Sequence, residues 1–506
     1  MDDNKRIATN TIILYCRTAI TMLLSLYTTR VILNQLGVVD NGVYNVIGGF
    51  VAMSNALVAP LSGATQRFVT YAIGSKDVNR VRDVFSACVY IHFLLAILSV
   101  VVIEIVGLWY IEYKINLPHD RIEAARFVFQ TSVIILFSRI VTVPYSAAVV
   151  AHEKFGFYAW NAIILSVLRL VLISFLSVLP NDKLISYSLM EMFAHVLLNI
   201  SFVWFCLKKL WGCDLVKSKG SAIYKEILGF SGWNFLGTSS SIIYTQGSGL
   251  LLNYFYGVLL NSAMGITQQV LNAINSFVSN FMMAVNPQIT KSYASENYNR
   301  SNALVFTSSK MASYLLLIVT FPIVANIHYI LDLWLVEVPV YTDVFVLFAI
   351  FSSFLALFIN PLNCLIFATG KIKTYQICCV VINILSVVAL YMFFLLHIHP
   401  AVLYVMLIFQ APLKLGILLY LARKETNFPV MKYLLEVYGK SILFIIPIIS
   451  VVFLKGWLSY EISFWQFVGE SILYIFIMVM LLFALGMDKG ERSELINFLR
   501  RKIRLK

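Results

Sequence analysis

Residues 85–111 read FSACVYIHFLLAILSVVVIEIVGLWYI, a run with one acid, Glu104, and no lysine or arginine. A helix needs about 20 mostly apolar residues to cross the hydrocarbon core of a bilayer. The run is therefore long and apolar enough to span a membrane. The same argument predicts fourteen spans, near 8–35, 42–63, 85–111, 127–150, 156–179, 184–207, 229–254, 260–285, 309–331, 341–369, 374–396, 400–422, 439–458 and 464–487.

The composition of the whole chain agrees with a membrane protein. Of its 506 residues, 60% are hydrophobic and only 12% are charged. A soluble domain carries roughly 25% charged residues. The surplus of apolar surface has to face lipid, which excludes a soluble fold. We therefore predict an all-α integral membrane protein with fourteen transmembrane helices.

The lysines and arginines report how the chain crosses the membrane. Cytoplasmic loops keep these residues because they resist translocation. The even-numbered linkers and the two chain ends hold 28 of the 38 lysines and arginines, whereas the odd-numbered linkers hold five. This alternation predicts that the N- and C-termini are both cytoplasmic. It also explains the net charge of +13 by topology and by attraction to anionic membrane lipids, so we expect no nucleic-acid partner.

The seven cysteines give no sign of a metal site. They lack metal-site spacing, and their odd number argues against a disulfide framework. Most of them lie within apolar stretches, where cysteine behaves as a small hydrophobic residue. We expect neither a metal nor a cofactor.

The two halves of the chain resemble one another. Leu33-Asn34-Gln35-Leu36-Gly37 and Thr65-Gln66-Arg67 have counterparts in 252–257 and in Pro287-Gln288-Ile289, at a nearly constant offset along the chain. Six spans separate the counterparts. Because six is even, the repeat is parallel, with a pseudo-twofold axis along the membrane normal. We predict an N-terminal lobe at 1–210 (spans 1–6), a C-terminal lobe at 211–425 (spans 7–12), and two extra spans with a basic cytoplasmic tail at 426–506.

Charged side chains are rare within the predicted spans, where charge is costly and usually functional. Arg17, Arg139 and Arg169 lie deep in spans of the first half. Together they predict a cationic cavity that binds phosphate, since the guanidinium fork pairs phosphate oxygens and stays charged when desolvated. The alternative is that these arginines form structural ion pairs with Glu104 and Glu191. Both interpretations stay open from the sequence.

Glu191 and His195 lie four residues apart on span six and are therefore neighbours on one helix face. Such a pair can relay a proton, because burial shifts the titration of both groups. A structural pair explains the same spacing.

Span eight carries a row of polar side chains. Gln268, Asn272, Asn275 and Ser279 follow the spacing i, i+4, i+7, i+11, which places them on one helix face. Within lipid, such groups need partners or water. The row either lines a path for a neutral polar ligand such as sugar or forms interhelical hydrogen bonds.

The N-terminal segment 1–80 resembles a known family. Asn10-Thr11, Arg17, the run Arg30 to Gly37, Gly42-Val43-Tyr44-Asn45-Val46 and Ser62-Gly63-Ala64-Thr65-Gln66-Arg67-Phe68 look like bacterial polysaccharide-biosynthesis membrane proteins. These are O-antigen or capsule repeat-unit flippases of the multidrug/oligosaccharidyl-lipid/polysaccharide exporter superfamily. The fourteen-span layout and the six-plus-six repeat extend the resemblance over the whole chain.

The resemblance implies a transport function in the bacterial inner membrane. The substrate would be an undecaprenyl-pyrophosphate-linked oligosaccharide, moved from the inner to the outer leaflet by alternating access, in a lipopolysaccharide-type pathway. Polymerase and glycosyltransferases of that pathway would be partners. Arg17, and with it Arg30 on another face of the same span, would be the span-one counterparts of the arginines that hold pyrophosphate in related lipid II flippases. Arg139 and Arg169 are added from their depth alone.

Two other functions are weighed against the flippase. A cation-coupled multidrug or small-molecule antiporter of the same fold would need cavity acids, and span one contains no acid. A membrane enzyme, such as a polysaccharide polymerase or an acyltransferase, would need a large outer loop or paired histidine and acid. The outer linkers are short, and the only histidine cluster, His397 with His399, lacks a neighbouring acid. We therefore expect a transporter and not an enzyme.

Overall fold

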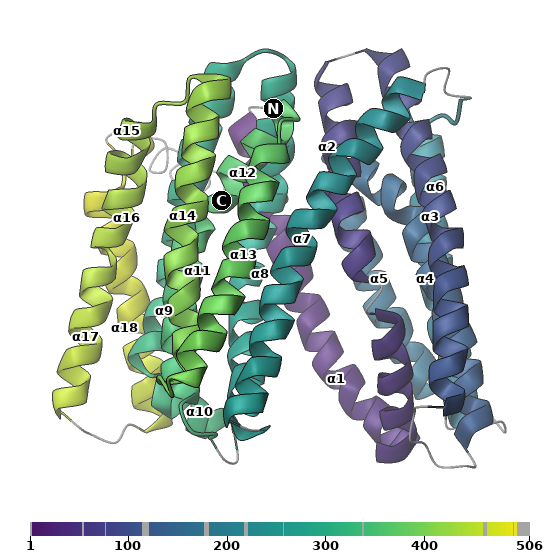
Figure 1. The fold of residues 1–506 in the computed structure, drawn as a ribbon, viewed down its shortest axis with the longest axis horizontal. Coiled ribbons are helices and arrows are strands. Elements are labelled where there is room, and N and C mark those ends of the chain that lie inside the picture. Colours follow the sequence, from purple (N-terminus) through teal and green to yellow (C-terminus); the bar gives the residue numbers. More distant parts are fainter. Residues whose placement is uncertain are drawn as a thin grey trace, which may run out of the picture. The chain divides into compact units, whose positions relative to one another are not determined.

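A computed structural model describes residues 3–52, 55–75, 77–113, 121–176, 182–216, 221–256, 258–335, 338–458, 463–488 and 490–492. Every regular element in these residues is a helix (Figure 1). The chain is thus all-α, as its composition predicts. Two short segments, η3 (Leu434–Gly439) and η4 (Leu482–Gly486), are π-helices that continue α-helices.

The helices group into two compact units. Unit 1 comprises Met1–Ser239 and Thr290–Asn297, and unit 2 comprises Ser240–Ile289 and Tyr298–Lys506. The sequence-based division at 210 and 425 remains a prediction. Unit 1 contains α1 (Asp3–Ala52), α2 (Asn55–Gly74), α3 (Val78–Tyr113), α4 (Ile122–Ala151), α5 (Phe155–Ser174) and α6 (Lys183–Lys209). Two helices, α7 (Ser221–Tyr256) and α8 (Val258–Ala294), pass from one unit into the other.

The remaining helices belong to unit 2. They are α9 (Tyr298–Ala325), α10 (Ile327–Trp334), α11 (Thr342–Leu357), α12 (Ile359–Thr369), α13 (Lys373–Leu395), α14 (Val402–Thr426), α15 (Val430–Tyr433), α16 (Lys440–Leu443), α17 (Ile445–Leu458) and α18 (Phe464–Leu481). The break between α11 and α12 at Phe358 precedes Pro361, which has no amide hydrogen to donate to the preceding turn. The predicted span 341–369 is therefore a bent pair of helices.

α4 forms the centre of unit 1. It packs against α1, α2, α3 and α6. Ala125, Ala148 and Ala151 are fully buried on it, and such small residues let helix backbones approach closely. Phe129 and Leu136 fill the adjoining hydrophobic core. Because α4 is held on several sides, it fixes the position of every side chain that it carries.

α9 forms the centre of unit 2, as α4 does of unit 1. It packs against α11, α12, α17 and α18. Two of its buried serines donate hydrogen bonds to carbonyl oxygens of their own helix, Ser308 to Val305 (3.3 Å) and Ser313 to Lys310 (2.7 Å). These bonds satisfy the hydroxyl groups where no water is present. Lys455 on α17 pairs with Glu470 on α18 and donates to Asn326 beside α9, so an ion pair ties the last two helices together.

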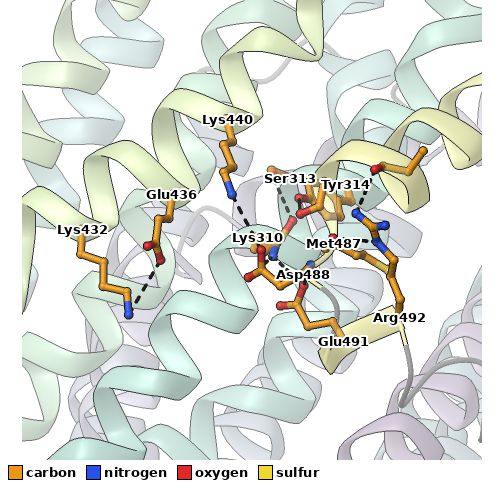
Figure 2. Close-up of polar contacts among 12 residues, drawn as sticks. Lys310, Ser313, Tyr314, Lys432, Glu436, Lys440, Met487, Asp488, Glu491 and Arg492 are labelled. Atoms are coloured by element: carbon orange, nitrogen blue, oxygen red, sulfur yellow. Dashed lines mark hydrogen bonds and ion pairs between the residues drawn. The ribbon is translucent and has the colours of Figure 1, made fainter.

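Charged residues fix the end of η4 to α9 (Figure 2). The Lys310 ammonium lies 2.6 Å from a carboxylate oxygen of Glu491 and 3.5 Å from one of Asp488. The Tyr314 hydroxyl donates to the Gly486 carbonyl at 2.7 Å. Lys310 is almost fully buried, so these carboxylates supply the negative charge that a buried ammonium needs.

Eleven helical segments in the described residues are long and apolar enough to cross a membrane, and the protein is a multi-pass membrane protein. The count of fourteen spans remains a prediction. α7 and α8 are 36 and 37 residues long but are not among the eleven. α8 carries the predicted polar row, which lowers its hydropathy. α1 is helical through 37–41, where the sequence predicts a break between two spans.

The helix ends agree with the sequence repeat. α2 ends at Gly74 and α8 at Ala294, whereas α3 begins at Val78 and α9 at Tyr298, so both pairs keep the same offset along the chain. The turn after each helix repeats as well. The Ser75 hydroxyl donates to the Ala72 carbonyl and the Ser295 hydroxyl to the Ser292 carbonyl.

Candidate functional site

Unit 1 contains a cavity of about 580 Å³ among helices that the sequence predicts to lie in the membrane. α4 supplies Arg139, Thr142, Val143 and Ser146, α5 supplies Tyr158, Asn161, Ala162 and Leu165, α6 supplies His195, Leu198, Asn199 and Phe202, and α2 supplies Ser62. The lining mixes amide, hydroxyl, imidazole and guanidinium groups with apolar side chains. Among its described residues the lining holds a cation but no acid.

Arg139 is the charged residue of this cavity. Its side chain is exposed on α4 although the helix is otherwise largely buried. No hydrogen bond or ion pair joins Arg139 to another residue in the part of the chain that the structure describes. A guanidinium within a membrane span is costly unless an anion or water meets it. The cavity therefore presents an uncompensated positive charge.

Two amide side chains, on two neighbouring helices, line the same cavity. Asn199 on α6 donates from Nδ2 to the Ser138 hydroxyl at 2.9 Å, and Asn161 on α5 donates to the Ser201 hydroxyl. These bonds engage the amide nitrogens with protein partners. Neither asparagine is among the sequence-predicted site residues. The signal for both is the same, a single amide within an apolar span.

Arg169 has a different environment from Arg139. Its Nε lies 2.9 and 2.7 Å from the two carboxylate oxygens of Glu191, and its Nη2 lies 2.6 Å from one of them. The Glu191 side chain is only 3% exposed. The two charges thus neutralise one another in a bidentate pair, which favours the structural interpretation of Arg169.

His195 joins this pair to the cavity. Its Nε2 lies 3.7 Å from a carboxylate oxygen of Glu191, and its ring lines the cavity that contains Arg139. The spacing of four residues does bring Glu191 and His195 together. However, the carboxylate is already held by Arg169, so it is not a free proton acceptor.

Of the two arginines in span one, Arg17 has a described side chain, and it lies near the cavity. The Arg17 guanidinium lies 5.2 Å from the ring centroid of Tyr158, which lines the cavity. A cation over an aromatic face is attracted by the ring quadrupole. Arg17 is thus placed at the cavity through one intervening side chain. The side chain of Arg30 lies outside the described residues.

The predicted polar row on α8 is exposed along one face of the helix. Gln268 donates to Asn272 at 3.0 Å, and the Ser353 hydroxyl of α11 donates to Asn275 Oδ1 at 2.7 Å. Gln268, Asn272, Asn275 and Ser279 are all exposed. The row belongs to unit 2 and is polar and uncharged, in contrast to the cavity of unit 1.

A second polar cavity, of about 430 Å³, lies in unit 2 beside the first half of α9. Its lysines have carboxylate partners, Lys310 with Glu491 and Lys432 with Glu436. It therefore lacks the unpaired cation that distinguishes the cavity of unit 1.

Comparisons with known proteins bear on the fold. No family model matches the sequence, and no curated protein matches it. Solved structures do match. One is a multidrug resistance MATE family transporter of the MOP superfamily in an outward-facing conformation, with a TM-score of 0.69 and 12% identity over 84% of this chain and 96% of that chain.

A second match is a MOP superfamily transporter from Pyrococcus furiosus Vc1 (DSM3638), for which reverse polarity of the binding pocket suggests a different function. It has a TM-score of 0.69 and 12% identity over 86% of this chain and 97% of that chain. A third, a MATE structure in the bent conformation, has a TM-score of 0.68 and 11% identity over 83% of this chain and 96% of that chain. At such identities the likeness shows the fold alone. The O-antigen and lipopolysaccharide assignments gain no support from it.

Proposed function

Because the chain has the fold of MOP superfamily transporters, we propose that it carries an anionic amphiphile across the membrane by alternating access. We further propose that the cargo is an oligosaccharide linked through pyrophosphate to a lipid. The observation that supports this cargo is the guanidinium of Arg139, which faces a cavity lined by no acid among the described residues. Multidrug cargo, by contrast, is commonly cationic and requires carboxylates.

Each part of such a cargo has a suitable partner in this chain. Arg139 would pair with pyrophosphate oxygens through two N–H groups, because guanidinium and phosphate match geometrically. Tyr158 and His195 would add hydrogen bonds from the same cavity. The lipid tail would stay in the bilayer. As a separate proposal for unit 2 alone, the exposed amides of α8 would bind sugar hydroxyls. No covalent bond forms or breaks in this mechanism.

The distribution of basic residues supports an orientation for this transport. With both termini in the cytoplasm of a bacterium and the protein in its inner membrane, the cargo would be loaded from the inner leaflet. Glycosyltransferases would supply the oligosaccharide, and a polymerase would consume it in the outer leaflet.

A cation-coupled multidrug antiporter is the second candidate. The structures that match this chain include a multidrug resistance MATE family transporter, and this likeness favours the antiporter over the flippase. The polarity of the cavity favours the flippase. Glu191, the buried carboxylate beside His195 of the cavity lining, is neutralised by Arg169 and is a poor binding group for a cationic drug.

A binding experiment separates the two candidates. The purified protein in nanodiscs is titrated with farnesyl pyrophosphate, with farnesol, and with the lipophilic cation tetraphenylphosphonium. We expect farnesyl pyrophosphate to bind and Arg139→Gln to weaken it at least about tenfold, which corresponds to the loss of one charge-assisted interaction. Arg139→Lys should weaken it less.

Arg126→Gln is the matched control. It removes an arginine from the same helix, but one that pairs with Glu112 at an exposed position. Its affinity for farnesyl pyrophosphate should equal that of the unaltered protein. Tight binding of tetraphenylphosphonium with none of the pyrophosphate would instead establish the antiporter.

A further inference from the structure

Lys414 is an intramembrane lysine without a carboxylate partner. It lies at the middle of α14, Val402–Thr426, a helix long and apolar enough to cross a membrane. Its Nζ donates to Asn383 Oδ1 at 2.8 Å and to Gln410 Oε1 at 2.9 Å. Both acceptors are neutral amides, and no acidic side chain pairs with Lys414 in the described residues.

The amides that hold Lys414 are themselves buried and ordered by hydrogen bonds. Asn383, on α13, is 2% exposed and donates from Nδ2 to the hydroxyls of Ser240 (2.8 Å) and Ser241 (3.2 Å) on α7. Three helices of unit 2 therefore meet at this lysine. The ammonium is therefore held by neutral oxygen acceptors whose positions are fixed by helix packing in the interior of unit 2.

Three other largely buried lysines each have a carboxylate partner, which Lys414 lacks among the described residues. Lys291 has Glu153 at 2.5 Å, Lys310 has Glu491 at 2.6 Å, and Lys455 has Glu470. A buried ammonium without a counter-charge is expensive, and the cost falls when the proton leaves. Lys414 can therefore both release and rebind a proton.

The Gln410 side chain is suited to both protonation states. It is 3% exposed, and its Nε2 has no hydrogen-bond partner among the described residues. While Lys414 is an ammonium, Gln410 accepts through Oε1. Once Lys414 is a neutral amine, a half-turn of the amide lets Nε2 donate to the nitrogen lone pair. The unpartnered N–H group is therefore satisfied in the deprotonated state.

We propose that Lys414 is a proton-binding site of unit 2 and that it releases and rebinds one proton in each transport cycle. This inference rests on the proposed transport function. It moves the coupling site from Glu191 and His195, where Arg169 holds the carboxylate, to a helix in the other unit.

Few other groups compete for this role. On α13 the titratable Cys379 lies four residues before Asn383 and therefore on the same helix face. α7 contributes the hydroxyls of Ser240 and Ser241, and α14 contributes Gln410. Of the helices that also pack on α14, α12 has no charged residue, and the one acid of α11, Asp343, lies in its first turn near His328.

The first test reads protonation directly and needs no substrate. Lysine labelled with 13C at Cε is followed by NMR in the full chain in nanodiscs, with the Lys414 signal identified by its absence from Lys414→Arg. We expect this signal to titrate at a lower pH than the bulk of the lysine signals. A signal that titrates together with that bulk overturns the proposal, and so does a titration that appears only in chloride and vanishes in gluconate, which would mean anion binding.

The second test reads coupling. Proteoliposomes carry an imposed pH gradient, and farnesyl pyrophosphate flux is compared among the unaltered protein, Lys414→Arg, Lys414→Gln and the control Lys455→Arg. Because arginine keeps its proton, Lys414→Arg should lose the dependence of flux on the gradient, as should Lys414→Gln, whereas Lys455→Arg should keep it. Retained dependence in both Lys414 variants overturns the proposal. If the unaltered protein moves no farnesyl pyrophosphate, the proposed function fails while the NMR test still decides whether Lys414 titrates.

Discussion

Gly74 and Ala294 occupy counterpart positions in the two halves of the chain, and they touch. A Cβ added to Gly74 would lie 2.7 Å from the Cβ of Ala294 and 3.0 Å from the Cα of Lys291. The first residue ends α2 and the second ends α8. The last turn of α8 is thus packed onto α2 within unit 1, although most of α8 belongs to unit 2.

Gly74→Ala should destabilise unit 1, because the nearest atoms include backbone atoms of Lys291 that cannot move aside easily. We expect a loss of about 1–3 kcal/mol in the free energy of unfolding, typical of overpacking. Thermal unfolding in detergent measures it. Gly229→Ala on α7 is the control, since nothing lies within 4 Å of its added Cβ. Equal stability of the two variants would show that the α2–α8 contact is looser than described.

Glu153→Gln should be among the most destabilising polar substitutions in unit 1. The Glu153 carboxylate is 3% exposed and lies 2.7 Å from Arg6 and 2.5 Å from Lys291. Its removal leaves two cations without their anion, at a cost of about 3–5 kcal/mol for a buried pair. The exposed pair of Glu112 with Arg126 provides the control, and Glu112→Gln should cost at most about 1 kcal/mol. Urea titration of both variants measures the difference.

The free energy of unfolding should fall as the pH drops below the ordinary pKa of histidine. Burial, together with the charges of Lys291 and Lys154, lowers the pKa of His152 below its ordinary value of 6.5, although hydrogen bonds that the imidazole donates to the backbone act to raise it. Below pH 6.5 the unfolded chain binds a proton at His152 that the folded protein does not bind. The contribution of His152 to stability is therefore complete above pH 6.5 and decreases below it. Thermal unfolding between pH 7.5 and 5 measures the slope.

The contribution of His152 to this slope is isolated by substitution. His152→Gln should flatten the pH dependence, whereas His328→Gln, at a largely exposed histidine, should leave it as it is. An unchanged slope in His152→Gln would assign the pH dependence to other groups.

Arg169 and Glu191 should behave as one structural unit. Either single substitution, Arg169→Gln or Glu191→Gln, should destabilise the protein because it leaves a buried charge unpaired. The double substitution should recover most of the loss, which a double-mutant cycle on thermal unfolding measures. Farnesyl pyrophosphate affinity should survive in the double variant. A loss of binding comparable to that of Arg139→Gln would instead make Arg169 a ligand.

The sequence predicts features that depend on spacing along one helix. The row Gln268, Asn272 and Asn275 shares one face of α8, and Glu191 lies beside His195, because side chains four residues apart meet in any helix. The repeat also follows from sequence, since the ends of α2 and α8 obey the same offset.

Features that depend on packing between helices escape such reasoning. Arg139 and Arg169 look alike in the sequence, as single arginines deep in apolar spans. Only the packing of α5 against α6 brings Glu191 to Arg169 and leaves Arg139 open to a cavity. The same holds for Lys414, whose amide partner Asn383 lies on another helix.

The chain passes between the two units at three points, and two of them lie inside helices. Ser239 and Ser240 are consecutive residues of α7, and Ile289 and Thr290 are consecutive residues of α8, whereas Asn297 and Tyr298 lie where α9 begins. At the first two points a continuous hydrogen-bonded helix carries the chain across. A helix resists bending, so α7 and α8 are elastic connections at these two points. Pro287, two residues before Ile289 in α8, removes one backbone hydrogen bond and makes α8 the more easily bent of the two helices.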